Sequence, residues 1–179
     1  MKRHARLALA IGVMILSACS RYDVIPDQLE KQVDKNVTFE QIKAAPASQK
    51  GTLVVLGGEV LTAKRLDANT RIELLQLPLS DDNIPITDRS QSKGRFYAFD
   101  AGKEILDPAT LTPGTPVTIV GEVTGAMTGK IGESDYQYPT LLIKDLTKWN
   151  KRDVRYRYPY YGYPYGGAYW YGARPFFFW

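Results

Sequence analysis

The chain has 179 residues, a length that suits one small domain with tails. Its single cysteine excludes a disulfide within the chain, and its single histidine, His4, lies in a segment that we expect to be removed. The 23 basic and 19 acidic residues give a net charge of +4. Three of those basic residues lie in the first 18, so the rest of the chain carries +1, which does not predict affinity for nucleic acid.

Residues 1–18 have the parts of a bacterial export signal. Three basic residues are followed by the uncharged, apolar run 7–16 and by the small residues Ser17 and Ala18. The cysteine follows at once, and the order Leu-Ser-Ala-Cys resembles a lipobox, in which diacylglycerol is linked to the thiol. We therefore predict a lipoprotein signal peptide over residues 1–18 and an acylated first residue at Cys19.

Two other interpretations of this leader are weaker. A transmembrane helix needs about 20 apolar residues, and the apolar run is about half that long. A secreted protein with a free Cys19 would keep a lone thiol in an oxidising compartment, where it is easily oxidised.

After the leader, residues 19–33 are predicted to be the acylated N-terminus and a polar tether, and residues 34–150 the domain. A short helix should open the domain. Thr38 can cap it and Gln41 stands three residues later, as in a capping box, while Pro46 limits its extension.

Five segments have the residue pattern of β-strands, namely 52–62, 70–77, 94–100, 116–124 and 140–146. Gly57-Gly58 predicts a bulge or bend that lets the first strand serve both sides of a small barrel. Asp107 before Pro108 predicts one helical turn between the third and fourth strands. A glycine-rich hairpin loop is predicted over residues 125–138.

These elements predict a mainly β fold, a small OB-like five-stranded β-barrel with one or two short helices and a disordered aromatic C-terminal tail. The alternative is a generic meander of similar length. Closure is favoured because an open sheet would leave exposed edges.

The third strand carries three aromatic residues, Phe96, Tyr97 and Phe99. At least two of them are expected to fill the barrel, because a small core needs large side chains. OB barrels often bind single strands or sugars across their second and third strands. Residues 19–150 carry a net charge of −3, which argues against a groove for nucleic-acid phosphates. The outer face of this sheet, with Tyr97 and the loop 80–93, is the candidate surface for binding a peptide or glycan.

Acidic residues are the remaining candidates for chemistry. Asp81, Asp82 and Asp88 could bind calcium or act as acid and base, but they lack the spacing of a calcium loop. We expect a solvated loop there, and the same for Glu133 and Asp135. No motif pairs a serine with a lysine. The sequence thus predicts no catalytic residue, no metal and no cofactor; a hydrolase that uses carboxylates is the enzymatic alternative.

Residues 151–179 form a tail of unusual composition. From Tyr156 onward it contains eight tyrosines, three phenylalanines and two tryptophans among glycines and prolines. Such a segment forms neither a long helix nor a packed core. Tyrosine and tryptophan favour the membrane interface, so the tail is a candidate adhesive segment for lipid, glycan or other copies. Its candidate contacts are Tyr156, Tyr158, Tyr160, Trp170 and Trp179. A low-complexity extension without a partner is the alternative.

Taken together, the leader, Gly57-Gly58, the segments 96–100 (Phe-Tyr-Ala-Phe-Asp) and 115–123 (Thr-Pro-Val-Thr-Ile-Val-Gly-Glu-Val) and the tail resemble the Slp family of Gram-negative outer-membrane lipoproteins. The resemblance covers the whole chain. It implies an OB-like outer-membrane lipoprotein linked to starvation or stationary-phase envelope physiology, and it carries over only the lipidated cysteine, Cys19. Ser20 fits it, since an aspartate there would be expected to retain the protein in the inner membrane.

The expected function is that of a non-enzymatic structural or interaction module, anchored to the outer membrane through Cys19 and facing the periplasm. Its partners would be membrane lipid and, as candidates, an envelope protein or peptidoglycan, but no nucleic acid. The alternative is an adaptor or assembly factor that binds an envelope protein or glycan through the barrel face or the tail.

Overall fold

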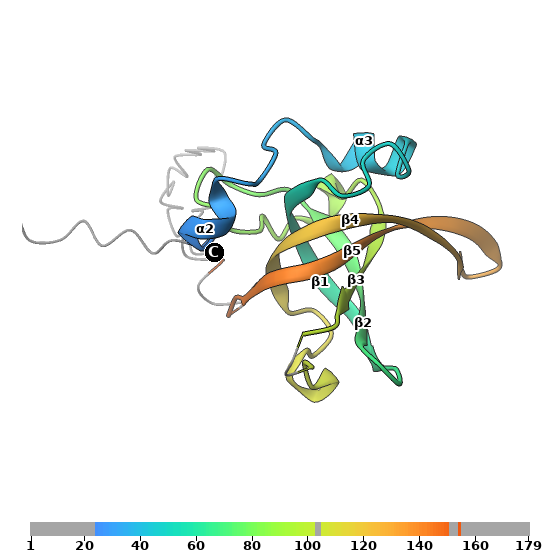
Figure 1. The fold of residues 1–179 in the computed structure, drawn as a ribbon. Helices are drawn as coiled ribbons and strands as arrows, with labels where there is room; N and C mark the ends of the chain where they lie inside the picture. Colours follow the sequence, from blue (N-terminus) through green and yellow to red (C-terminus); the bar gives the residue numbers. More distant parts are fainter. Residues whose placement is uncertain (1–23, 103–104, 151–153, 155–179) are drawn as a thin grey trace, which may run out of the picture.

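The computed structural model describes residues 24–102, 105–150 and 154. These residues form short helices, single turns of 3-10 helix and the strands of a sheet (Figure 1). In chain order the elements are α2 (Asp27–Glu30), α3 (Phe39–Ala44), β1 (Leu53–Arg65), β2 (Thr70–Leu77), η2 (Arg89–Gln91), β3 (Arg95–Asp100), η3 (Pro108–Thr110), β4 (Pro116–Ile131) and β5 (Ser134–Lys148).

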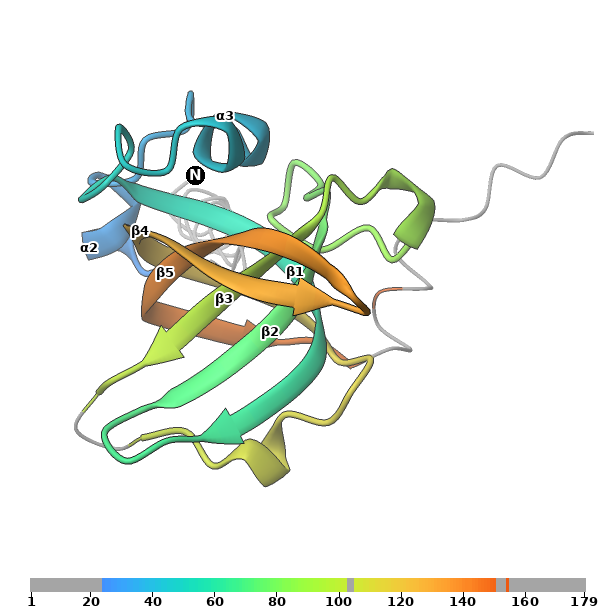
Figure 2. The ribbon, with the colours of Figure 1, turned by 90° about the vertical axis from the view of Figure 1, so that its right-hand side faces the viewer.

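The strands close into one barrel, in the order β1-β2-β3-β5-β4, with β4 returning to β1. Neighbouring strands are antiparallel except for β3 and β5, which run parallel. Figure 2 shows β1, β2 and β3 side by side, with β4 and β5 crossing them. The predicted mainly β fold, an OB-like five-stranded barrel with short helices, is confirmed.

Strand β1 serves two neighbours because it is long and curved. Its residues 53–59 pair with β4 and residues 57–65 pair with β2. Where the two pairings overlap the strands lie close, and a Cβ atom on Gly57 would lie 2.7 Å from a backbone oxygen of β2. The prediction that one strand serves both sides is confirmed. The bulge itself lies further on, between Val60 and Thr62.

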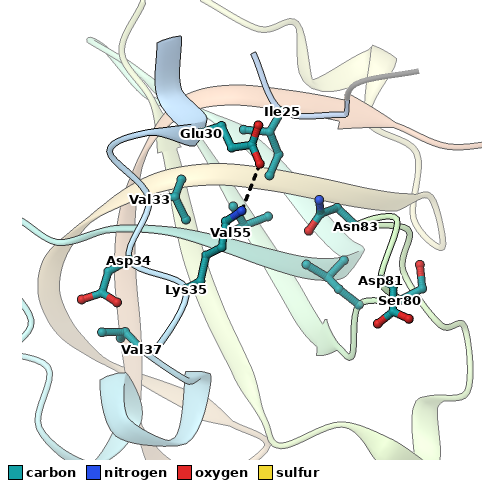
Figure 3. A pocket seen from close by; sticks show the side chains of 11 residues that line it. Ile25, Glu30, Val33, Asp34, Lys35, Val37, Val55, Ser80, Asp81 and Asn83 are labelled. Carbon is teal, nitrogen blue, oxygen red and sulfur yellow. Dashed lines mark hydrogen bonds and ion pairs between the residues drawn. The ribbon is translucent and has the colours of Figure 1, made fainter. Parts of the chain in front are cut away.

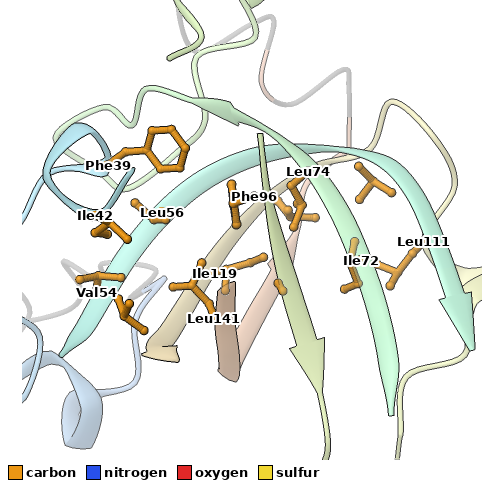
Figure 4. Close-up of a cluster of buried hydrophobic side chains, with 14 residues drawn as sticks. Phe39, Ile42, Val54, Leu56, Ile72, Leu74, Phe96, Leu111, Ile119 and Leu141 are labelled. Atoms are coloured by element: carbon orange, nitrogen blue, oxygen red, sulfur yellow. The ribbon is translucent and has the colours of Figure 1, made fainter. Parts of the chain in front are cut away.

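The core fills the barrel and is covered at one end by α3 (Figure 4). Phe39 and Ile42 come from this helix, and the ring of Phe39 lies 5.9 Å from that of Phe96. The helix begins as predicted, because the Thr38 side chain accepts a hydrogen bond from the backbone N–H of Gln41 and the capping box is complete. Each such buried side chain contributes about 1.5–3 kcal/mol.

The aromatic residues of β3 are distributed between the barrel interior and its outer wall differently from the prediction. Phe96 and Ala98 belong to the core, whereas Tyr97 and Phe99 do not. In a strand, residues two apart share a face, so Tyr97 and Phe99 both lie on the outer wall of the barrel. The expectation that at least two of the three aromatic residues fill the barrel is therefore wrong.

The prediction of a loop over residues 125–138 is also wrong. Strands β4 and β5 continue through it and are joined by the two residues Gly132 and Glu133. Gly132 has φ 61, which suits the first central position of a type II′ hairpin turn. The paired segments 125–131 and 134–139 form a hairpin that projects from the barrel (Figure 1). Residues 126–128 of β4 are exposed in succession, so burial imposes no alternation on this arm of the hairpin.

Candidate functional site

The N-terminal segment lies on the barrel from Val24 onward. Val24 and Ile25 are only 7% and 5% exposed, and the carbonyl of Val24 accepts a hydrogen bond of 3.5 Å from Thr147 Oγ1 in β5. Helix α2 follows, and the N–H of Asp34 donates to Leu53 O at 2.9 Å. Val24 and Ile25 of the expected tether thus pack against the domain, whereas residues 26–28 and 30–32 are exposed. Cys19, which lies outside the described residues, stands five positions before Val24.

A half-open cavity of about 340 Å³ lies between this segment, β1 and the loop after β2 (Figure 3). Apolar side chains from all three, including Ile25, Val55 and Leu79, line it. Lys35 and Glu30 form an exposed ion pair of 3.0 Å at its rim. Its lining comes from segments far apart in the sequence, so no local pattern could have predicted it.

Tyr97 lies on the outer wall in a stack of rings. Its ring is 4.1 Å from that of Tyr138, nearly parallel at 12°, and the guanidinium of Arg71 lies 4.8 Å from its centroid. Since the stacked ring occupies one face, the guanidinium occupies the other. Tyr97 is only 8% exposed, so a sugar or peptide could stack on it only if Arg71 moved aside.

Tyr138 fixes the base of the hairpin to the barrel. Its ring is fully buried, and its hydroxyl lies 3.2 Å from both Glu73 Oε1 and the carbonyl of Lys130. Burial and, second, the negative charge of Glu73 raise the pKa of Tyr138 to about 12. The same carboxylate pairs with Arg95 at 2.9 Å, and this hydrogen bond raises the pKa of Arg95.

Tyr136 makes a second attachment between the hairpin and the barrel. Its hydroxyl accepts a hydrogen bond of 3.0 Å from the backbone N–H of Arg95. The ring meets Tyr138 edge to face at 4.7 Å, and Lys43 Nζ of α3 lies 5.4 Å from its centroid. We call Tyr97, Phe99, Tyr136 and Tyr138 the outer aromatic cluster. Its ring contacts and hydrogen bonds hold the hairpin against the barrel. The sequence did not predict this cluster because Tyr136 and Tyr138 both lie in the segment that was expected to be a loop.

The acidic candidates lie in three separate segments, the turn after β2, the start of η2 and the tip of the β4–β5 hairpin. Asp88 caps η2, and hydrogen bonds, first from the Ser90 hydroxyl, lower its pKa. Asp81 and Asp82 are exposed in the turn after β2, and Glu133 is exposed at the hairpin tip. Within residues 24–102, 105–150 and 154, no three His, Cys, Asp or Glu side chains gather in a way that could hold a metal ion.

The tail candidates Tyr156, Tyr158, Tyr160, Trp170 and Trp179 lie outside the described residues. In the part of the chain that the structure describes, no helix is long and apolar enough to cross a membrane.

A closed OB-like barrel, preceded in the sequence by a leader that resembles a lipobox, is typical of one class, the lipid-anchored domains of the bacterial envelope. The outer membrane lipoprotein Slp family matches residues 16–177. The chain belongs to this family, and its place is the outer membrane.

The chain is similar to two curated proteins, of which the first is named a lipoprotein. The uncharacterized lipoprotein YeaY of Escherichia coli (strain K12) is 30% identical over 138 residues, which are 76% of this chain and 68% of the relative. An uncharacterized protein of Haemophilus influenzae is 29% identical over 134 residues, 75% of this chain and 71% of the relative.

Solved structures show only distant likeness. The Schizosaccharomyces pombe protein Pot1pC, in a complex with single-stranded DNA, is 12% identical with a TM-score of 0.33, covering 58% of this chain and 83% of that one. A putative aspartyl-tRNA synthetase of Leishmania major is 11% identical with a TM-score of 0.36, covering 65% and 22%. Both TM-scores are below 0.5, so neither likeness bears on what this chain binds.

Proposed function

We propose that this protein is a non-enzymatic module of the bacterial envelope, held to the outer membrane by acyl chains on Cys19 with its barrel in the periplasm. The observation that carries the proposal is the lipobox leader directly before the folded body, in a chain of an outer-membrane lipoprotein family. Each buried methylene contributes about 0.8 kcal/mol, so two or three acyl chains hold a protein stably. Protease added to intact cells should leave a barrel on the periplasmic side uncut, and cutting would contradict that orientation.

Replacing the anchor residue tests the proposal. Cys19→Ala should accumulate as an unprocessed precursor and take up no labelled palmitate, because the thiol that carries the lipid is absent. Ser20→Ala is the matched control and should be labelled like the wild type. Equal label in Cys19→Ala and wild type would refute the anchor.

An adaptor for an envelope protein is the second candidate, and the hairpin favours it. Within the described residues, segments 126–131 of β4 and 134–139 of β5 pair only with each other, so each has an outer edge without a second strand. Met127 is 43% exposed on this hairpin. An extended segment of another protein could add to such an edge through backbone hydrogen bonds.

For the finer physiological role we propose a link to starvation or stationary phase, which the resemblance to the Slp family implies. Loss of this protein should therefore change envelope integrity in stationary phase more than in growing cells. An equal effect in both phases, measured by detergent sensitivity of a deletion strain, would contradict the link.

A further inference from the structure

The short distance between the anchor and the folded body limits how far the barrel can lie from lipid. Five residue steps separate Cys19 from Val24, and each extended residue spans at most about 3.6 Å, so the reach is about 18 Å. Val24 is fixed to the barrel by its burial and by the contact with Thr147. The polar tether expected from the sequence is therefore too short to lift the domain clear of the membrane.

The surface around Val24 is one end of the barrel, which we call the anchor pole and define as residues 24–30, 79–83, 116–118 and 147–150. Its parts are joined by hydrogen bonds. The N–H of Trp149 donates to Pro116 O at 2.9 Å, and the indole N–H of Trp149 donates to Thr118 Oγ1 at 3.0 Å. Thr118 Oγ1 in turn donates to Asn83 O at 2.7 Å. Figure 1 shows α2 and the end of β5 on the same side of the molecule.

The C-terminal tail also leaves from this end. Strand β5 ends at Lys148, and the N–H of Val154 donates to Asn150 O at 3.3 Å, which keeps Val154 within a turn of the pole. The remaining 25 residues hold eight tyrosines and two tryptophans, side chains that favour the membrane interface. Both potential attachments to lipid thus start from one end of the barrel.

The β4–β5 hairpin points the other way. Val117 pairs with Lys148 at the anchor pole, and β4 then runs 14 residues to Ile131. At about 3.3 Å per residue the path is about 45 Å. In Figure 1 the hairpin extends to the side opposite α2, and in Figure 2 it comes toward the viewer while α2 lies behind.

From this geometry we infer that the anchor pole lies against the phospholipid surface and that the β4–β5 hairpin is held away from it. The inference rests on the proposed acylation of Cys19. The pole carries one basic residue, Lys148, and four acidic residues, Asp27, Glu30, Asp81 and Asp82, so the short anchor rather than charge attraction imposes the contact. The contact should therefore persist at high salt, which screens surface charges.

Fluorescence quenching by lipid tests the orientation. The acylated full-length protein is labelled at a single introduced cysteine, either Gln28→Cys on α2 or Glu133→Cys at the hairpin tip, and is reconstituted into phospholipid vesicles. Both positions are exposed, and the thioether at Cys19 leaves no competing thiol. With a spin label on the lipid headgroup, the probe at residue 28 should lose most of its fluorescence and the probe at residue 133 should keep most of it. Equal quenching, quenching at the tip alone, or none at either site would overturn the inference.

A lengthened tether is the matched control. Twenty Gly/Ser residues inserted between Tyr22 and Asp23 add a coil of about 25 Å, which should reduce quenching at residue 28. Unchanged quenching would mean that the short tether does not set the orientation. The N-terminal mass of the same sample separates the two claims: an acylated protein with the wrong pattern defeats only the orientation, whereas a protein without acyl chains defeats the anchor as well.

Discussion

At the scale of single residues, the hydroxyl of Tyr138 is the group that most directly ties the β4–β5 hairpin to the barrel. It lies 3.2 Å from Glu73 Oε1 and has no solvent exposure. Tyr138→Phe keeps the ring and its stack on Tyr97 but removes the hydrogen bond to a charged group. The free energy of unfolding should fall by about 1.5 kcal/mol, measured by urea unfolding at pH 7.

The same hydroxyl predicts how stability depends on pH. The pKa of Tyr138 is raised from 10.0 to about 12 in the folded protein, so the unfolded chain loses this proton first. The stabilisation is complete below pH 10 and disappears as the pH rises toward 12. Stability of the wild type should fall more steeply over this range than that of Tyr138→Phe, in which the other titrating groups are unchanged. Parallel curves would contradict the assigned role.

At the scale of elements, the β4–β5 hairpin is the surface that an adaptor would use. A photo-reactive amino acid in place of Met127 should give one reproducible cross-linked envelope protein in living cells, because this side chain is 43% exposed beside an open strand edge. The control position is Asp67, which is exposed in the turn between β1 and β2. The adaptor candidate fails if both positions give the same products or if neither gives any.

Helices and strands that are specified by nearby residues, through a helix cap or an alternation of apolar and polar side chains, could be predicted from the sequence. Thr38 and Gln41 carry a capping box within four residues, and Ile72 and Leu74 alternate with polar neighbours along β2, so both elements were expected within a few residues. Gly57 indicated that β1 pairs with both β2 and β4. A Cβ atom at this position would lie 2.7 Å from the backbone oxygen of Leu77 in β2, so only glycine lets the two strands lie so close.

The hairpin and the outer aromatic cluster could not be predicted, for a physical reason. The β4 arm of the hairpin is exposed on the successive residues 126–128, which removes there the alternation on which strand prediction rests. The stack of Tyr97 on Tyr138 joins residues 41 positions apart, and a contact of that range leaves no local pattern. The burial of Val24 and Ile25 also left no local pattern, because Val24 contacts Thr147 of β5 and Ile25 lines a cavity with Val55 and Leu79, all far away in the sequence.

At the scale of the whole molecule, the aromatic tail is a candidate second attachment to the envelope. Deleting residues 156–179 from the Cys19→Ala chain should reduce its sedimentation with phospholipid vesicles or peptidoglycan, since tyrosine and tryptophan side chains favour the membrane interface and aromatic rings stack on sugars. The non-acylated background is needed because an acyl anchor would hide the weaker contribution of the tail. Unchanged partition after the deletion would remove the adhesive role.

The lipid on Cys19 decides where the whole molecule is held, and intact-mass spectrometry of the native protein from purified outer membranes measures it directly. The mature chain should begin at Cys19 and carry the mass of a diacylglyceryl group with further acylation of the new N-terminus. A mature chain that begins at another residue, or that has an unmodified Cys19, would contradict the account.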